Sequence, residues 1–268
     1  MTGPIIAFAA TDRGLRRENN EDAYLIDAGL GLYVVADGMG GARGGEVASQ
    51  MAVRCMRDAL QAEVERCGDV SADTQAEAHP LYRGVARAVA HANASIYRRA
   101  DHEPNLMGMG TTLTGLAFAA GQAFLAHVGD SRAYRIRGRT IEQVSDDHTY
   151  AQELVRAGSL GPEEARHLPY RHVLSRAVGV EPDVNVDVRA MRTRPGDVFV
   201  LCSDGLANVV TEIEIRDAVL DTFLRSAPDR LVRLANQRGG PDNITVVVVC
   251  VNDEGANDDG DGQDRRSA

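Results

Sequence analysis

Short apolar runs open the chain and predict β-strands. They cover residues 5–11, 23–27 and 31–37, and each is bounded by glycine or polar residues. Two longer segments then carry apolar residues three and four positions apart, which is the period of an amphipathic helix. Val47, Met51 and Cys55 mark the first helix, and Val85 and Ile96 belong to the second. Residues 68–79 between them are polar and predict a loop.

The second half of the chain returns to strand patterns. Strands are predicted at 111–119, 122–128, 132–137, 140–144, 184–188, 198–203 and 243–251. The connections at 120–121 and 138–139 are tight, so the strands that they join must pair antiparallel. Residues 146–179 lose strand character and predict a short helix with glycine- and proline-marked turns. Helical patterns at 212–220 and 229–237 precede the last strand.

Strands and helices come in blocks along this chain. Strict alternation would indicate a parallel sheet, whereas blocks favour an α+β fold with antiparallel sheets covered by helices. With 268 residues and 44% hydrophobic content, the chain can bury a sizeable core. We expect one domain over residues 1–252. Residues 253–268 hold no apolar side chain larger than alanine and predict an acidic, disordered tail.

The composition limits which cellular compartment and which binding partners are plausible. The net charge is −10, and part of it belongs to the acidic tail, so the body is only mildly acidic. Without a basic stripe or any Trp, nucleic acid is a poor candidate partner. The four cysteines form no CxxC pair, which fits a reducing cytoplasm. The longest apolar stretch, 244–251, is too short to span a membrane, and no signal peptide pattern opens the chain.

All 29 basic residues are Arg, and the chain contains no Lys. Reaction classes that need a lysine are therefore excluded, among them P-loop phosphate binding and Schiff-base chemistry. Any recognition of phosphate by a cationic side chain must use Arg. Arg17 is the candidate, since a guanidinium matches phosphate oxygens with two parallel hydrogen bonds. Its segment RRENNED at 16–22 has a simpler alternative as a run of surface ion pairs.

Acidic residues follow apolar strands at several places. Asp37, Asp130 and Asp204 each end such a strand, and Asp242 precedes the last one. A single Asp-Gly is most simply a turn. If the strand ends converge, however, the carboxylates crowd together and need cations to offset their repulsion. Ligands that are all oxygen favour Mg²⁺ or Mn²⁺, and two such ions can activate a water for phosphoryl transfer.

Six motifs in order give the chain a family resemblance. They are RRENNED (16–22), VVADGMGG (34–41), GMGTT (108–112), VGDSR (128–132), LCSDGL (201–206) and GGPDN (239–243). From about residue 6 to residue 251, the chain resembles the metal-dependent serine/threonine protein phosphatases of type 2C (PPM), particularly their compact bacterial members. The resemblance implies a β-sandwich of two antiparallel sheets flanked by pairs of α-helices, in four αββα layers. It also implies an inserted flap at about 146–179.

The resemblance also implies a dinuclear Mn²⁺ or Mg²⁺ centre. In the family's pattern, Asp37 bridges both ions, and Asp204 and Asp242 complete one of the two sites. The Gly38 carbonyl and Glu21 contribute to the other site.

The remaining site residues follow from the same motifs. Asp22 resembles an outer residue that holds a metal-bound water, and Arg17 matches the phosphate-binding Arg. Asp130, together with Asp204, matches a third and weaker metal site of bacterial members. Asn243 is assigned a supporting role beside Asp242.

The activity implied is hydrolysis of phosphoserine and phosphothreonine in proteins. A metal-bound hydroxide attacks phosphorus without a covalent phosphoenzyme, in opposition to a Ser/Thr kinase. Some members, notably eukaryotic ones, carry a histidine near the metal centre as general acid, whereas Met39 follows the Asp-Gly here. Protonation of the leaving group is therefore assigned to a metal-bound water or to another residue. His127 and His148 are possible proton donors, but only their residue type suggests it. A structural or surface role is favoured for both.

Other enzyme classes can be tested on the same residues. Cysteine-nucleophile phosphatases need an Arg six positions after the Cys, which none of the four cysteines has. The DxDx(T/V) string of aspartyl-nucleophile phosphatases does not follow Asp37. A two-metal nuclease would need a basic groove. A catalytically silent phosphatase scaffold that only binds phosphoproteins should have lost a metal carboxylate or the phosphate Arg, and this chain keeps them. Four arginines of the predicted flap could recognise acidic or phosphorylated substrates, but a solvated surface is the favoured interpretation for each. They are Arg156, Arg166, Arg171 and Arg176. We expect a monomer.

Overall fold

Two antiparallel sheets packed face to face form the centre of the computed structural model, which describes residues 5–40, 44–68, 70–71 and 74–252. One sheet has the order β1 (Ile5–Asp12), β11 (Ile244–Val251), β10 (Val198–Cys202), β7 (Arg132–Arg137) and β8 (Thr140–Gln143). The other has the order β2 (Asp22–Asp27), β3 (Leu32–Met39), β5 (Leu113–Ala119), β6 (Gln122–Val128) and β9 (Asp187–Arg192), and β4 (Gly110–Thr111) pairs with β3. The predicted tail at 253–268 lies outside the described residues.

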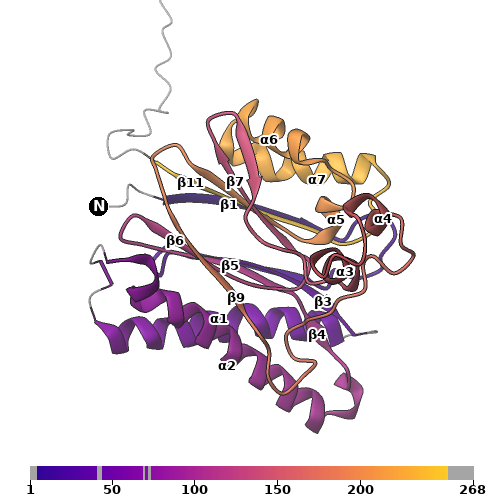
Figure 1. The fold of residues 1–268 in the computed structure, drawn as a ribbon, viewed down its shortest axis with the longest axis horizontal. Helices are drawn as coiled ribbons and strands as arrows, with labels where there is room; N and C mark the ends of the chain where they lie inside the picture. The colour runs from indigo at the N-terminus through magenta and orange to yellow at the C-terminus, as the bar shows by residue number, and fades with distance from the viewer. Residues whose placement is uncertain (1–4, 41–43, 69, 72–73, 253–268) are drawn as a thin grey trace, which may run out of the picture.

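Helix pairs cover both outer faces of the sandwich (Figure 1). Helices α1 (Gly44–Cys67) and α2 (Pro80–His102) pack on the sheet of β3, β5 and β6, whereas α6 (Glu212–Leu220) and α7 (Ala227–Gln237) pack on the sheet of β10 and β11. Helices α3 (Tyr150–Arg156), α4 (Pro162–Arg166) and α5 (Asp204–Ala207) lie together at one end (Figure 1). Short 3₁₀ turns occupy Ala76–Ala78, Pro104–Leu106 and Leu224–Ser226. The predicted α+β sandwich is confirmed.

The central strands are buried on both faces, which explains why they are almost wholly apolar. In β3, Val34 faces the α1–α2 layer and Val35 faces the opposite sheet. In β11, Val248 faces the α6–α7 layer and Val249 faces the opposite sheet. Successive side chains of a strand point to opposite faces, so each strand contributes to two cores. Burying each such side chain stabilises the fold by about 1.5–3 kcal/mol.

Three details differ from the sequence prediction. The strand predicted at 184–188 is Asp187–Arg192, which pairs with β6 from His127, opposite Asp187, to Gln122, opposite Arg192. Val184 and Val186 still pack on the α1–α2 core, although they lie outside the strand, so the predicted bounds were wrong. Residues 146–179 hold two short helices where one was predicted, and α5 was not predicted. Among the residues described, no helix combines the length and apolar character needed to cross a membrane.

Candidate metal centre

Asp22 and Asp37 lie directly opposite each other on the paired strands β2 and β3. Burial raises the pKa of Asp22 to about 7, although the hydroxyl of Ser203 donates a 2.8 Å hydrogen bond to its Oδ2. Its Oδ1 is buried without a hydrogen-bond partner among the described residues. Burial, and then the charges of Asp22 and Asp204, hold the pKa of Asp37 well above its usual range. The two carboxyl groups are thus crowded and poorly solvated.

The opposite sheet brings Asp204 and Asp242 to the same place. Asp204 follows β10 as the first residue of α5, and Asp242 stands two residues before β11. Burial and the negative charge of Asp242 raise the pKa of Asp204, whose Oδ2 accepts a 3.1 Å hydrogen bond from Asn208 Nδ2. Asp242 Oδ1 accepts a 2.8 Å hydrogen bond from the backbone N–H of Asn243.

Asp130 belongs to the same group of acids. It follows β6, and its side chain is almost completely buried. Burial, and then the negative charge of Asp204, raise the pKa of Asp130 to about 8. Asp37 in turn responds to the charge of Asp130. Four strand ends from two sheets therefore place their aspartates within electrostatic reach of one another.

Asn243 fastens the loop that carries Glu21. Its Nδ2 donates to the carbonyl oxygens of Arg13, at 2.9 Å, and Asn19, at 2.8 Å, and its Oδ1 accepts from the Glu21 N–H at 2.8 Å. Burial raises the pKa of Glu21. Gly38 packs so closely on the first turn of α1 that a Cβ there would lie 2.2 Å from the Gly45 carbonyl oxygen. The same Cβ would lie 2.5 Å from the Glu21 carbonyl oxygen, so Glu21 and Gly38 are neighbours.

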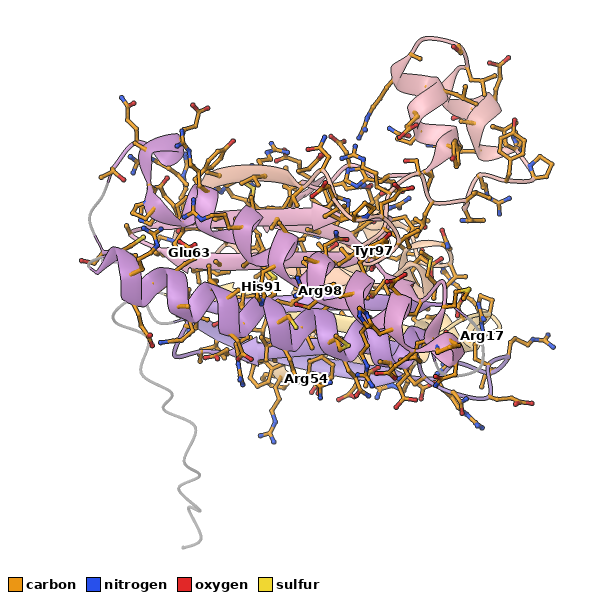
Figure 2. The ribbon with its side chains drawn as sticks, turned by 90° about the horizontal axis from the view of Figure 1, so that it is seen from below. Arg17, Arg54, Glu63, His91, Tyr97 and Arg98 are labelled. Atoms are coloured by element: carbon orange, nitrogen blue, oxygen red, sulfur yellow. The ribbon has the colours of Figure 1, made fainter. Side chains whose placement is uncertain are left out.

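Arg17 stands at the rim of this group. Its Nη2 lies 2.7 Å from Asp242 Oδ2, and 55% of its side-chain surface is exposed. Its pKa is raised, first by the hydrogen bond to Asp242. Figure 2 shows Arg17 at one end of the molecule. The guanidinium is therefore anchored to an acidic residue and remains open to solvent.

Several hydroxyl groups that sequence reasoning left without a role hold these acids in place. Thr112 Oγ1 accepts the Asp37 N–H at 2.9 Å and contacts Ser131 Oγ at 2.7 Å. Thr111 Oγ1 donates to the Asp37 carbonyl oxygen at 2.9 Å. Ser203 Oγ, besides binding Asp22, accepts the Thr245 N–H at 2.9 Å. The string GMGTT marked two of these residues, but only the folded chain shows which backbone groups they bind.

The donor set fits a hard divalent cation. It consists of carboxylate oxygens, it includes the unpartnered Asp22 Oδ1, and it is short of compensating positive charge. In the described part of the chain, no three acidic, histidine or cysteine side chains converge on one point to form a complete site. Asp242 is engaged by Arg17, Asp22 by Ser203 and Asp204 by Asn208, and these contacts hold the carboxyl groups in their present orientations.

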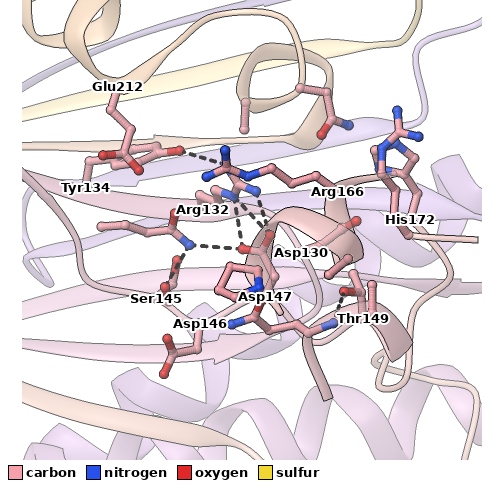
Figure 3. A pocket seen from close by; sticks show the side chains of 18 of the residues that line it. Asp130, Arg132, Tyr134, Ser145, Asp146, Asp147, Thr149, Arg166, His172 and Glu212 are labelled. Carbon is pink, nitrogen blue, oxygen red and sulfur yellow. Dashed lines mark hydrogen bonds and ion pairs between the residues drawn. The ribbon is translucent and has the colours of Figure 1, made fainter. Parts of the chain in front are cut away.

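A cleft of about 870 Å³ adjoins Asp130 (Figure 3). The segment 146–179, which was predicted to be a flap and keeps that name below, contributes Asp147, Arg171 and His172 to its lining, and the body contributes Arg132 and Glu212. Among these lining residues, Arg132 and Asp147 form a close ion pair, with Nη2 and Oδ2 2.7 Å apart. A polar cleft next to the acids suits an extended polar ligand.

A model of the family described as "Protein phosphatase 2C" matches residues 14–239. The chain belongs to this family. It is 40% identical over 251 residues to the serine/threonine protein phosphatase PstP of Mycobacterium tuberculosis (strain H37Rv), an alignment that covers 93% of this chain and 46% of PstP. The chain therefore spans about half the length of PstP. Protein phosphatase PhpP of Streptococcus pneumoniae (serotype 2, strain D39) is 39% identical, with 92% of this chain and 97% of PhpP covered.

A solved structure of a protein phosphatase 2C relative has the same fold. The crystal structure of the catalytic domain of PstP in complex with two manganese ions superposes with a TM-score of 0.76 at 38% identity. The match covers 93% of this chain and 99% of that one. The resemblance found in the six motifs is thus confirmed over most of the chain.

Proposed function

We propose that this chain is a metal-dependent protein phosphatase that hydrolyses phosphoserine and phosphothreonine. The observation that carries the proposal is the meeting of Asp37, Asp130, Asp204 and Asp242 beside a solvent-facing Arg17. Membership of the protein phosphatase 2C family supports the reaction, and the manganese ions in PstP support the metal. Mn²⁺ or Mg²⁺ is proposed for two sites, with a third at Asp130.

Each acidic residue has a defined part in this proposal. Asp37 would hold both ions, Asp204 and Asp242 would complete one site, and Glu21 with the Gly38 carbonyl would complete the other. When bound, the two ions would lower the pKa of a water and so supply a nucleophile at neutral pH. Asp22 would accept a hydrogen bond from a water of the site through its free Oδ1. Catalysis would rest on Asp37, Asp204 and Arg17.

Arg17 is proposed to bind the phosphoryl group of the substrate. Its guanidinium is held by Asp242 through one nitrogen and keeps donors free for phosphate oxygens. The cleft next to Asp130 would receive the surrounding polypeptide of the phosphoprotein. His127 and His148 are buried and have both ring nitrogens engaged by protein groups, which supports the structural role over that of a proton donor.

The proposed setting is a reducing cytoplasm with a Ser/Thr kinase as the opposing enzyme. Four cysteines without a disulfide agree with that setting. The single-domain extent, 1–252, and the monomeric state stay predictions.

The test is turnover of a phosphothreonine peptide. We expect phosphate release with Mn²⁺, none with EDTA, and loss of at least about a hundredfold in kcat/KM for Asp37→Asn and for Asp204→Ala, because loss of one ligand disables a metal site. Asp58→Asn, on the exposed face of α1, is the matched control and should leave activity unchanged. Turnover in EDTA, or full activity in either site variant, contradicts the proposal.

A further inference from the structure

His148 holds both backbone polar groups of Gly129. The His148 N–H donates to the Gly129 carbonyl oxygen at 2.7 Å, and the Gly129 N–H donates to His148 Nδ1 at 3.1 Å. Gly129 has a φ of +111°, and a Cβ there would lie 2.6 Å from the Thr112 side chain. A single residue of the flap thus fixes a glycine that no other residue can replace without strain. That glycine immediately precedes Asp130.

The second ring nitrogen of His148 points to the start of β9. Because a backbone N–H can only donate, Nδ1 must be the acceptor, and Nε2 carries the proton of the neutral ring. Nε2 donates to Asp187 Oδ2 at 3.0 Å. The ring is fully buried, and burial lowers the pKa of His148, in agreement with a neutral side chain. Both nitrogens are therefore committed to structural contacts.

Asp187 extends the contact to the far end of the flap. Its Oδ1 accepts a 2.8 Å hydrogen bond from Arg176 Nη1. The two ends of the flap also meet directly, since the Ser175 N–H donates to the His148 carbonyl oxygen at 2.9 Å and Thr149 bridges Leu174. The base of the flap is thus closed around His148.

Neighbouring contacts tie the same segment to the body. The Asp146 carbonyl oxygen lies 3.0 Å from His127 Nε2, and Asp147 pairs with Arg132 (Figure 3). These contacts restrain residues 146 and 147, whereas His148, the next residue, is the one of these three that bonds to the glycine before Asp130.

We propose that His148 is a positioning residue, which sets the orientation of the Gly129–Asp130 turn and links it through Asp187 to the base of the flap. The inference rests on the proposed phosphatase function. It predicts that a change at His148 acts through Asp130, whereas a change at Asp187 acts through the flap.

Two substitutions at His148 separate its contacts. In His148→Asn, the amide oxygen can take the place of Nδ1 and keep the bond to Gly129. In His148→Gln, the longer amide can reach Asp187 but lacks an acceptor at the position of Nδ1. We expect His148→Gln to lower kcat/KM on a phosphothreonine peptide about 10–100-fold and to weaken Mn²⁺ binding measured by titration calorimetry, as loss of a supporting contact does. His148→Asn should retain Mn²⁺ binding and kcat, and its only expected change is a raised KM for the peptide, because it gives up the contact with Asp187.

A double-mutant cycle tests whether the effect passes through Asp130. If it does, His148→Gln combined with Asp130→Asn should be no worse than Asp130→Asn alone. Losses that multiply would overturn the inference. So would unchanged Mn²⁺ binding and unchanged kcat/KM in a folded His148→Gln protein.

Asp187→Ala tests the link to the flap and keeps the proposal testable if the buried His148 variants do not fold. Asp187 is 41% exposed at its side chain. We expect a raised KM for the peptide with unchanged Mn²⁺ binding, and an unchanged KM would overturn the link. Gln122→Ala, a buried polar residue at the other end of β6, is the matched control and should alter neither property. If the unmodified chain bound Mn²⁺ but hydrolysed no peptide, the proposed function would fail while calorimetry could still decide the role of His148.

Discussion

Burial is the largest influence on the pKa of nearly every acid at the candidate centre. It is the first cause of the raised pKa values of Asp22, Asp37, Asp130, Asp204 and Glu21, ahead of the repulsion between them. A carboxylate in a low-dielectric site is costly to ionise unless a cation compensates it. The buried carboxyl groups of the candidate centre are therefore stable only when they bind a proton or a metal cation.

Arg17 is the residue at which phosphate recognition can be tested. Arg17→Ala should raise KM for a phosphopeptide about tenfold or more with a smaller change in kcat, since a charged hydrogen bond in ground-state binding contributes roughly 1.5–3 kcal/mol. Steady-state kinetics measures this split. Arg16→Ala is the matched control, because Arg16 is exposed in the same loop. An equal effect of both substitutions would assign the effect to the general charge of the loop.

The sequence identified the acids more readily than the groups that hold them. Asp37, Asp130 and Asp204 were marked by the abrupt change from apolar strand to acidic residue. Ser203 and Thr112 were not assigned, because a hydroxyl shows its role only through a partner, and their partners Asp22 and Asp37 lie 181 and 75 residues away. Asn243 was given a supporting role, but the loop contacts that define it depend on tertiary structure.

At the scale of elements, the apolar pattern predicted the type of each helix or strand better than its bounds. The helix predicted near 212–220 is found at Glu212–Leu220, and the structure shows that Thr211 and Glu214 form a capping box at its start. The bounds of β9 were shifted, because the pairing partner limits a strand and the partner cannot be read from local residues. The two short helices of the flap follow from a Thr149 cap and from Pro162, which are weak local signals.

The contact between the two sheets predicts a large difference between two phenylalanines. Phe199 of β10 is fully buried, and its ring meets that of Phe118 edge-on at 5.4 Å between centroids, whereas Phe223 is 88% exposed. Phe199→Ala should lower the free energy of unfolding by about 3–5 kcal/mol. Phe223→Ala should change it by less than about 0.5 kcal/mol. Urea unfolding followed by circular dichroism measures both, and similar values would contradict the assigned core.

For the whole molecule, the crowded acids predict a stability that depends on pH. The folded pKa values of Asp22 and Asp130, about 7 and about 8, exceed the unfolded value near ~3.9. The native chain then holds protons that the unfolded chain has released. Stability is therefore highest at low pH within this window and falls as the pH rises from about 4 to about 8.

In EDTA, we expect Tm to fall by about 5 °C or more between pH 5.5 and pH 8.5, since ~1 kcal/mol corresponds to roughly 2–4 °C for a chain of this size. Asp130→Asn should reduce the slope, and Mn²⁺ should raise Tm at pH 8.5 because it binds the folded state. Differential scanning calorimetry measures both effects. A Tm in EDTA that is constant or rises over this range would contradict the assigned burial.

The pairing of β1 with β11 has a consequence for synthesis. Ile5 pairs with Val251, so the first strand of the described chain has its partner at the opposite end of the sequence. During translation the N-terminal strand must wait until β11 leaves the ribosome before its sheet can close. Contacts of such high sequence separation slow folding and leave strand edges exposed in the meantime. A nascent chain arrested before residue 244 would lack the strand between β1 and β10 and is expected to depend on chaperones.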